Sequence, residues 1–192
     1  MEPITILFYV LSSFLVLNEN TVAADKTTVT VEPQSQQINI VQDNLFTVIH
    51  KDENVSVVEA PQAVILSQVQ KDASWANDMS RFTDKDITFS SQEGKLDSHI
   101  TLTYQNAEDL RAFGVWYNAE KNQFSINHVP DDNLQTENGQ QLGNYWVFDG
   151  DSTFSFTLEP FAELPAHYQK TYYQDVDYRD YKISVSEPPM QK

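Results

Sequence analysis

Tyrosines and aspartates that could bind a ligand crowd the C-terminal part of the chain. Five tyrosines lie within the fourteen residues from 168 to 181. A tyrosine offers an apolar ring and a polar hydroxyl, which suits sugar faces and lipid head groups, and neighbouring carboxylates can accept hydrogen bonds from sugar hydroxyls. The alternative is a loop whose rings cover the edge of the core. The expected ligand-binding residues are Tyr168, Tyr172, Tyr173, Tyr178 and, from the middle of the chain, Trp116.

Two acidic runs have the composition of oxygen-rich cation loops. Calcium prefers oxygen ligands in such loops, and an extracellular protein meets it at useful concentrations. Neither run matches the EF-hand loop, which needs a glycine at its sixth position and a glutamate at its twelfth. Solvated acidic turns are therefore the alternative, and calcium is the one cofactor considered. The candidate metal ligands are Asp149 and Asp151 in one run and Asp175, Asp177 and Asp180 in the other.

Local signatures of catalysis are missing from the sequence. The four histidines, His50, His99, His128 and His167, form no i, i+4 pair, and no H-E-x-x-H motif occurs. The G-x-S-x-G turn of serine hydrolases is also absent, and five glycines leave no phosphate-cradling loop. The sequence favours a non-enzymatic protein, and a hydrolase assembled from distant residues stays as an alternative.

Composition restricts the partners and the chemistry. The chain has 28 acidic and 12 basic residues, a formal net charge of −16. Nucleic acid is excluded as an expected partner because phosphate contacts need clustered Lys and Arg, and anionic membranes are not favoured either. The chain has no cysteine, which excludes disulfides, Cys-ligated zinc and a thiol nucleophile.

The N-terminus reads as a secretory signal segment. An almost entirely apolar run extends from Ile4 to Leu17, and Val22 and Ala24 supply small residues before a cut. The run is shorter than the roughly 18–20 apolar residues of a membrane span. It lacks the usual Lys or Arg in front, and a retained anchor is the alternative. We expect a secreted or periplasmic protein, of bacterial origin because an exported domain of this size would elsewhere usually carry disulfides.

Short runs of alternating apolar and polar residues predict a β-rich domain. Asp149-Gly150-Asp151 predicts a hairpin between two of these runs. Helix signals are weak, at Ser74–Phe82, Asn106–Arg111 and Phe161–Tyr173. The predicted strands include Thr28–Val31, Gln37–Val41, Leu45–His50, Val55–Glu59, Ala63–Val69, Asp86–Ser90, His99–Tyr104, Ala112–Tyr117, Gln123–His128, Tyr145–Phe148, Thr153–Leu158 and Tyr181–Val185.

These runs predict an all-β fold: a single antiparallel β-sandwich of about ten short strands, with a partly closed barrel as the alternative. The expected organisation is a signal segment at 1–24, a polar lead-in at 25–36, the β-sandwich domain at 37–186 and a flexible tail at 187–192.

One internal segment resembles a known superfamily. From Leu96 to His128 the chain has a strand ending near an asparagine, a short acidic turn and a second strand with Phe113-Gly114-Val115. This order resembles the fungal fruit-body lectins, whose β-sandwich is shared with the actinoporins and, more distantly, with the thermostable direct haemolysins. The resemblance covers about thirty residues. It implies an extracellular binding β-sandwich, with membrane activity as a sharper version.

The chain also departs from that superfamily. Where the lectins carry a Trp and an Asp that contact sugar, this chain has Asn122, Gln123 and Phe124. The paired tryptophans and basic stretch of the actinoporins and the cysteines of the haemolysins are missing. No ligand residue is therefore carried over.

Three functions follow as hypotheses. The first is a secreted, non-enzymatic protein that contacts a glycan, a lipid head group or a protein through its tyrosine-rich surface, with a membrane-active toxin as its sharper version. The second is an exported structural or accessory protein with a protein partner, which an exposed long strand edge would favour. The third is the hydrolase with a distributed active site, which would need a deep pocket lined by a histidine and carboxylates.

Overall fold

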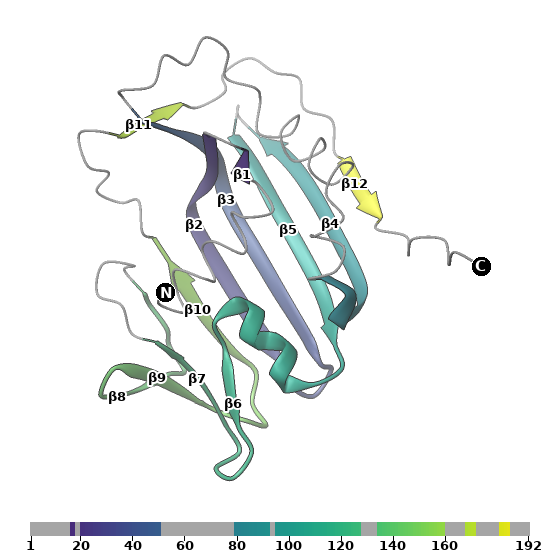
Figure 1. Ribbon diagram of the computed structural model, residues 1–192, viewed down its shortest axis with the longest axis vertical. Helices are drawn as coiled ribbons and strands as arrows, with labels where there is room; N and C mark the ends of the chain where they lie inside the picture. The colour runs from purple at the N-terminus through teal and green to yellow at the C-terminus, as the bar shows by residue number, and fades with distance from the viewer. Residues whose placement is uncertain are drawn as a thin grey trace.

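The protein is an all-β sandwich of two antiparallel sheets, seen in a computed structural model (Figure 1). The structure describes residues 16–17, 20–50, 79–92, 95–127, 134–159, 168–171 and 181–184. The sandwich prediction is confirmed, since these residues form two separate sheets and do not close into a barrel. No helix within this described part is long and apolar enough to cross a membrane.

The larger sheet has eight strands, in the order β1-β2-β3-β5-β4-β12, with β10 beside β2 and β11 beside β3. Its strands are β1 (Val16–Leu17), β2 (Asn20–Glu32), β3 (Gln37–His50), β4 (Phe82–Gln92), β5 (Lys95–Tyr104), β10 (Phe154–Leu158), β11 (Tyr168–Thr171) and β12 (Tyr181–Ser184). The smaller sheet has the order β6-β7-β9-β8. Its strands are β6 (Trp116–Asn118), β7 (Gln123–Asn127), β8 (Gln140–Leu142) and β9 (Tyr145–Asp149).

Period-two alternation decides which face of each strand enters the core. In β5 the burial pattern alternates along its whole length, and Ile100, Leu102 and Tyr104 all point into the core, as predicted. In β10, Phe154, Phe156 and Leu158 do the same. Because successive side chains of a strand point to opposite faces, the Thr and Ser residues between them lie on the outer face of the larger sheet.

The long β2–β3 hairpin changes neighbours along its length. From Thr27 to Val31, β2 lies between β3 and β10, while its first residues pair with β1 instead. Along β3 the neighbour changes from β5 to β11 between Gln42 and Thr47. Asn44 sits at this change with a left-handed backbone, φ 54°. Its N–H donates to Asp97 Oδ1 at 2.8 Å and its side chain donates to Asp25.

Two short 3₁₀ helices complete the described elements, η1 (Met79–Arg81) and η2 (Ala107–Phe113). The strand predicted at Ala112–Tyr117 is therefore wrong for residues 112–115 and right for Trp116 and Tyr117, and a helical turn at Asn106–Arg111 is confirmed. Gly114 is the reason: its left-handed backbone, φ 71°, ends η2 and leaves only Trp116 onward for β6. Leu110 and Phe113 bury one side of η2, which packs against β5 and β6.

The hairpin predicted at Asp149-Gly150-Asp151 is wrong. This turn leads from β9 in the smaller sheet to β10 in the larger sheet, so the two strands do not pair with each other (Figure 1). Each strand has other partners: β9 lies between β7 and β8, and β10 lies beside β2. The turn therefore connects the two layers of the sandwich.

Other boundaries differ from the sequence prediction in smaller ways. The predicted strands Gln37–Val41 and Leu45–His50 are one strand, β3. Strand β8 was not predicted, because its sequence Gln-Gln-Leu has no alternation and all three residues are exposed. Tyr168–Thr171, inside a weak helix signal, is a strand. The predicted strands at 55–59 and 63–69 lie outside the described residues.

The predicted cut after Ala24 falls within β2. Ala24 is buried and pairs with Leu45 of β3. Residues 25–32, expected as part of a polar lead-in, form the rest of β2. The signal segment itself stays a prediction.

Candidate functional site

The outer face of the larger sheet carries polar side chains where the inner face carries apolar ones. The register places Ser155, Thr30, Asn39 and Thr101 in one row across four strands, β10-β2-β3-β5. Thr157 and Thr28 begin the next row. β-Branched threonine suits a strand, so these residues favour the fold while presenting hydroxyls. We call this set, Thr28, Thr30, Asn39, Thr101, Ser155 and Thr157, the polar face.

Hydrogen bonds between strands hold the polar face together. Thr30 Oγ1 donates to Ser155 Oγ at 3.1 Å, and the hydroxyls of Thr28 and Thr157 lie 3.3 Å apart. Thr101 Oγ1 donates to Asn39 Oδ1 at 2.8 Å, and Asn39 Nδ2 donates to Glu32 at 3.1 Å. These side chains are half-buried. These bonds favour defined orientations of the side chains.

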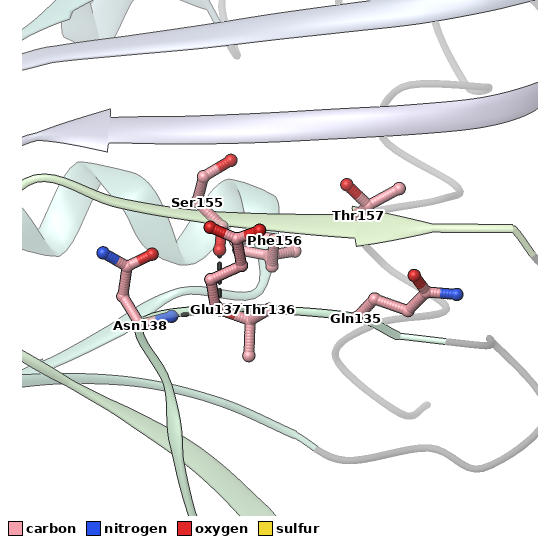
Figure 2. Close-up of a pocket in the computed structure, with 7 residues that line it drawn as sticks. All are labelled: Gln135, Thr136, Glu137, Asn138, Ser155, Phe156 and Thr157. Carbon is pink, nitrogen blue, oxygen red and sulfur yellow. Dashed lines mark hydrogen bonds between the residues drawn. The ribbon is translucent and has the colours of Figure 1, made fainter.

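A short segment extends this sheet beyond β10 (Figure 2). Gln135 and Thr157 exchange backbone hydrogen bonds of 2.9 and 2.8 Å. The hydroxyl of Thr136 then donates to the Ser155 carbonyl at 2.7 Å. The sequence could not show this contact, because residues 135 and 157 are far apart in the chain and no strand was predicted at 135.

A hollow of about 390 Å³ lies where this segment runs alongside β10. We call it the edge hollow; Figure 2 shows its lining residues, which are Gln135, Thr136, Glu137, Asn138, Ser155, Phe156 and Thr157. Ser155 and Thr157 belong to both the hollow and the polar face, so the two are continuous. The lining supplies hydroxyls and amides, which both donate and accept, and a single carboxylate.

A second cleft, of about 200 Å³, lies where turns of the two sheets meet. Hydrogen bonds join three side chains along one wall. Tyr117 Oη donates to Asn122 Oδ1 and Asn122 Nδ2 donates to Asp151 Oδ2, each at 2.8 Å. Tyr104 lines the same cleft. Burial raises the pKa of Tyr104 to about 12, so its hydroxyl keeps its proton at neutral pH.

The structure places only part of the expected tyrosine-rich surface. Trp116 is half-buried in β6, opposite Ser125 of β7. Tyr168 begins β11, and its backbone pairs with His50. Tyr172, Tyr173 and Tyr178 lie outside the described residues, so the tyrosine surface stays a prediction.

Two of the five candidate calcium ligands, Asp149 and Asp151, lie in the described part and order a turn. Asp149 Oδ1 accepts the Asp151 N–H at 2.9 Å, and Asp151 Oδ2 accepts the Asn122 amide. Within the described ranges, no group of three or more His, Cys, Asp or Glu side chains is arranged to hold a metal ion. The other candidates, Asp175, Asp177 and Asp180, lie outside those ranges, and calcium stays a prediction.

The polar face was not predicted from the sequence, although alternating hydroxyl residues mark it. Thr28 and Thr30, Thr101 and Thr103, and Ser155 and Thr157 each place hydroxyls at alternate positions of a predicted strand. Side by side they make a surface, but only strand order reveals which of them are neighbours. No protein-family model, no curated protein and no solved structure matches this chain.

Proposed function

We propose that the protein is a non-enzymatic binding protein that holds a hydroxyl-rich glycan on the polar face and in the edge hollow. The observation that carries the proposal is the hydrogen-bonded row of Ser155 and Thr30, together with Thr157 and Thr28, at the rim of the hollow. Hydroxyls and amides both donate and accept, as glycan hydroxyls do. Ligand sites typically orient their ligands with a few such placed polar groups.

Charge supports a neutral ligand. None of the six residues of the polar face is charged, and Glu137 of the hollow and Glu32 beside the face are acidic. A phosphate or an anionic lipid head group would meet these carboxylates and the net charge of −16. A neutral glycan meets only hydrogen-bonding groups. If the predicted export holds, such ligands are available outside the cell.

The structural or accessory alternative is less well supported. It would be favoured by a long exposed strand edge, because such edges pair with other chains. At β10 the edge is instead covered where Gln135 pairs with Thr157. The Thr136 hydroxyl also donates a hydrogen bond to the Ser155 carbonyl on that edge.

A glycan array with the protein, followed by calorimetry on the hits, tests the proposal. The double variant Thr28→Val, Thr157→Val removes both partners of one hydroxyl pair and keeps β-branched side chains in both strands. We expect it to fold and to lose affinity by roughly tenfold or more, because a hydrogen bond contributes about 0.5–1.5 kcal/mol.

Thr88→Val is the matched control. Thr88 is a half-buried threonine on the same face, but β4 lies four strands away from β10 in the sheet. It should bind like the wild type. A blank array, or a double variant that binds as tightly as the wild type, would contradict the proposal.

A further inference from the structure

The cleft between the two sheets is built from several separate turns. It is lined by Pro33, Gln34, Gln36, Tyr104, Ala107, Tyr117, Asn122, Phe124, Gly150 and Asp151. These residues come from the β2–β3 turn, the end of β5, η2, strands β6 and β7, and the β6–β7 and β9–β10 turns. It shares no residue with the edge hollow.

Tyr104 is the unusual member of this lining. Only 3% of its surface is exposed, and no hydrogen bond to its hydroxyl occurs among the residues that the structure describes. The hydroxyl is not a fully enclosed, unpaired polar atom, so its small exposed surface is open to a partner, and Tyr104 lines this cleft. Burial also raises its pKa to about 12, so the group remains a neutral donor across the physiological range. The hydroxyl is thus suited to a partner that enters the cleft.

The opposite wall is fixed by the backbone as well as by side chains. Asn122 has a left-handed backbone, φ 47°, and its carbonyl accepts the N–H of Gly150 at 2.9 Å. A Cβ on Gly150 would clash with the Asn122 side chain and lie 2.6 Å from its carbonyl oxygen. Glycine at 150 therefore allows the two turns to touch, and this contact positions the Tyr117–Asn122–Asp151 chain.

Two glutamines complete the polar lining. Gln34 Nε2 donates to the Asp151 carbonyl and Gln36 Nε2 donates to the Gln105 carbonyl, each at 3.2 Å. Both amides are thus oriented with their nitrogens engaged, and their oxygens can accept. Asp151 Oδ2 is engaged by Asn122, and its other oxygen can accept as well. The cleft then combines one hydroxyl donor with several acceptors.

We propose that this cleft binds a single sugar ring or a comparable small polyol, with Tyr104 donating to one ligand hydroxyl and Asp151 and Gln34 accepting from others. The volume of about 200 Å³ is below the range of roughly 300–1,000 Å³ typical of drug-sized ligands. The lining contains no Lys, Arg or His and one carboxylate, which disfavours anions. This proposal does not depend on the glycan site of the polar face.

The test is ligand-observed saturation-transfer NMR with the whole protein and a panel of glucose, galactose, mannose, N-acetylglucosamine and myo-inositol. We expect at least one member to bind. Tyr104→Phe removes only the hydroxyl and should weaken that binding by roughly two- to tenfold. Because the hydroxyl has no internal partner in the described part, the variant should unfold at the same temperature as the wild type or a higher one.

Tyr145→Phe is the matched control, since Tyr145 is 49% exposed on β9 and lies outside the cleft. It should bind as the wild type does. Asp151→Asn provides a second variant that keeps the side-chain shape and should also weaken binding. A panel with no binder at millimolar concentration, or a folded Tyr104→Phe that binds equally well, would overturn the proposal.

The same variants separate this cleft from the polar face. Tyr104→Phe should leave glycan-array binding through Thr28 and Thr157 unchanged, while the Thr28→Val, Thr157→Val variant should leave binding of the single sugar unchanged. A loss of both activities in either variant would show that the two surfaces are not separate sites and would overturn the proposal of an independent cleft.

Discussion

The rings of Phe148 and Phe154 stack with their centroids 4.3 Å apart and their planes 18° from parallel. The two residues are close in sequence, yet one belongs to β9 in the smaller sheet and the other to β10 in the larger sheet. Both are fully buried. Their contact joins the two layers immediately behind the Asp149–Asp151 turn.

Phe148→Ala should destabilise the fold by about 3–5 kcal/mol, because it removes a large buried ring and leaves a cavity between the layers. Urea unfolding measures this change. Phe148→Leu, which retains much of the volume, should cost less and keeps the experiment informative if the alanine variant does not fold. Tyr145→Ala, at an exposed position of the same strand, is the control. Equal losses in Phe148→Ala and Tyr145→Ala would contradict the assignment of Phe148 to the core.

Ser98→Ala tests a polar contact inside the apolar face of the larger sheet. Ser98 Oγ donates to Gln42 Oε1 at 2.8 Å, and both residues are buried. Losing the donor leaves a buried acceptor unpaired, so we expect a loss of about 1–3 kcal/mol in urea unfolding. The double variant Ser98→Ala, Gln42→Leu should recover part of that loss. Ser90→Ala, exposed on β4, should change little, and a Ser98 effect no larger than this would refute the argument.

Gly150→Ala should be more costly than Gly143→Ala. At position 150 a Cβ would run into Asn122, whereas at position 143 it meets no atom within 4 Å and only the left-handed backbone, φ 60°, opposes it. We expect about 1–3 kcal/mol for overpacking at 150 and about 1 kcal/mol for backbone strain at 143. Thermal unfolding compares the two. If Gly143→Ala were the worse variant, the close contact at Gly150 would not limit the turn.

Asp43→Asn should stabilise the protein at neutral pH. Burial and the nearby Asp97 raise the pKa of Asp43 above its ordinary value of 3.8, and Lys26 partly offsets them. A carboxyl with a raised pKa binds its proton more tightly in the folded chain, so its contribution to stability is present at low pH and is lost as the pH rises through the folded pKa. The gain in the variant should therefore be clear at pH 7 and shrink towards pH 3.8.

Unfolding free energies of Asp43→Asn and the wild type at several pH values measure this effect. Asp84→Asn, at an exposed position of β4, controls for the loss of one negative charge. A gain that is the same at every pH, or that matches the Asp84→Asn gain, would rule out the explanation.

Export predicts a mature chain that begins at Asp25. The cut would leave Asp25–Glu32 of β2, including all five residues that pair with β10 and most of the pairs with β3. Ala24→Leu should block processing, because a bulky residue replaces the small one before the cut. N-terminal sequencing of the secreted or periplasmic protein, with Ala23→Ser as a conservative control, tests this. A mature chain that retains Val16 and Leu17 would refute the predicted cut.

Alternation in the sequence predicted most described strands because each strand has one apolar and one polar face. Phe154 and Phe156 illustrate this. Alternation failed to predict the structure where the backbone conformation of one residue sets an element boundary, as at Gly114. It also failed where a strand has no apolar face, as in β8. The Asp-Gly pair predicted a tight turn correctly, but the pairing of the flanking strands depends on long-range partners that local sequence does not specify.

Little of the candidate site could be predicted. The cleft gathers Gln34, Tyr104, Asn122 and Asp151 from four separate segments. Their sequence spacing carries no signal, because each residue is an ordinary turn or strand residue in its own context. Asp151 was singled out, but as a calcium ligand, and the structure shows its carboxylate bound to an amide.

The polar face has a further consequence for selectivity. Neighbouring strands lie about 4.8 Å apart and alternate residues of one strand about 6.8 Å apart, so its bonded hydroxyls form a two-dimensional grid. Its side chains are already ordered. A repeating polymer whose own period is commensurate with the grid would make many matched contacts at once, and one with another period would make few. Recognition would then depend on the repeat distance of the polymer more than on the identity of any one unit.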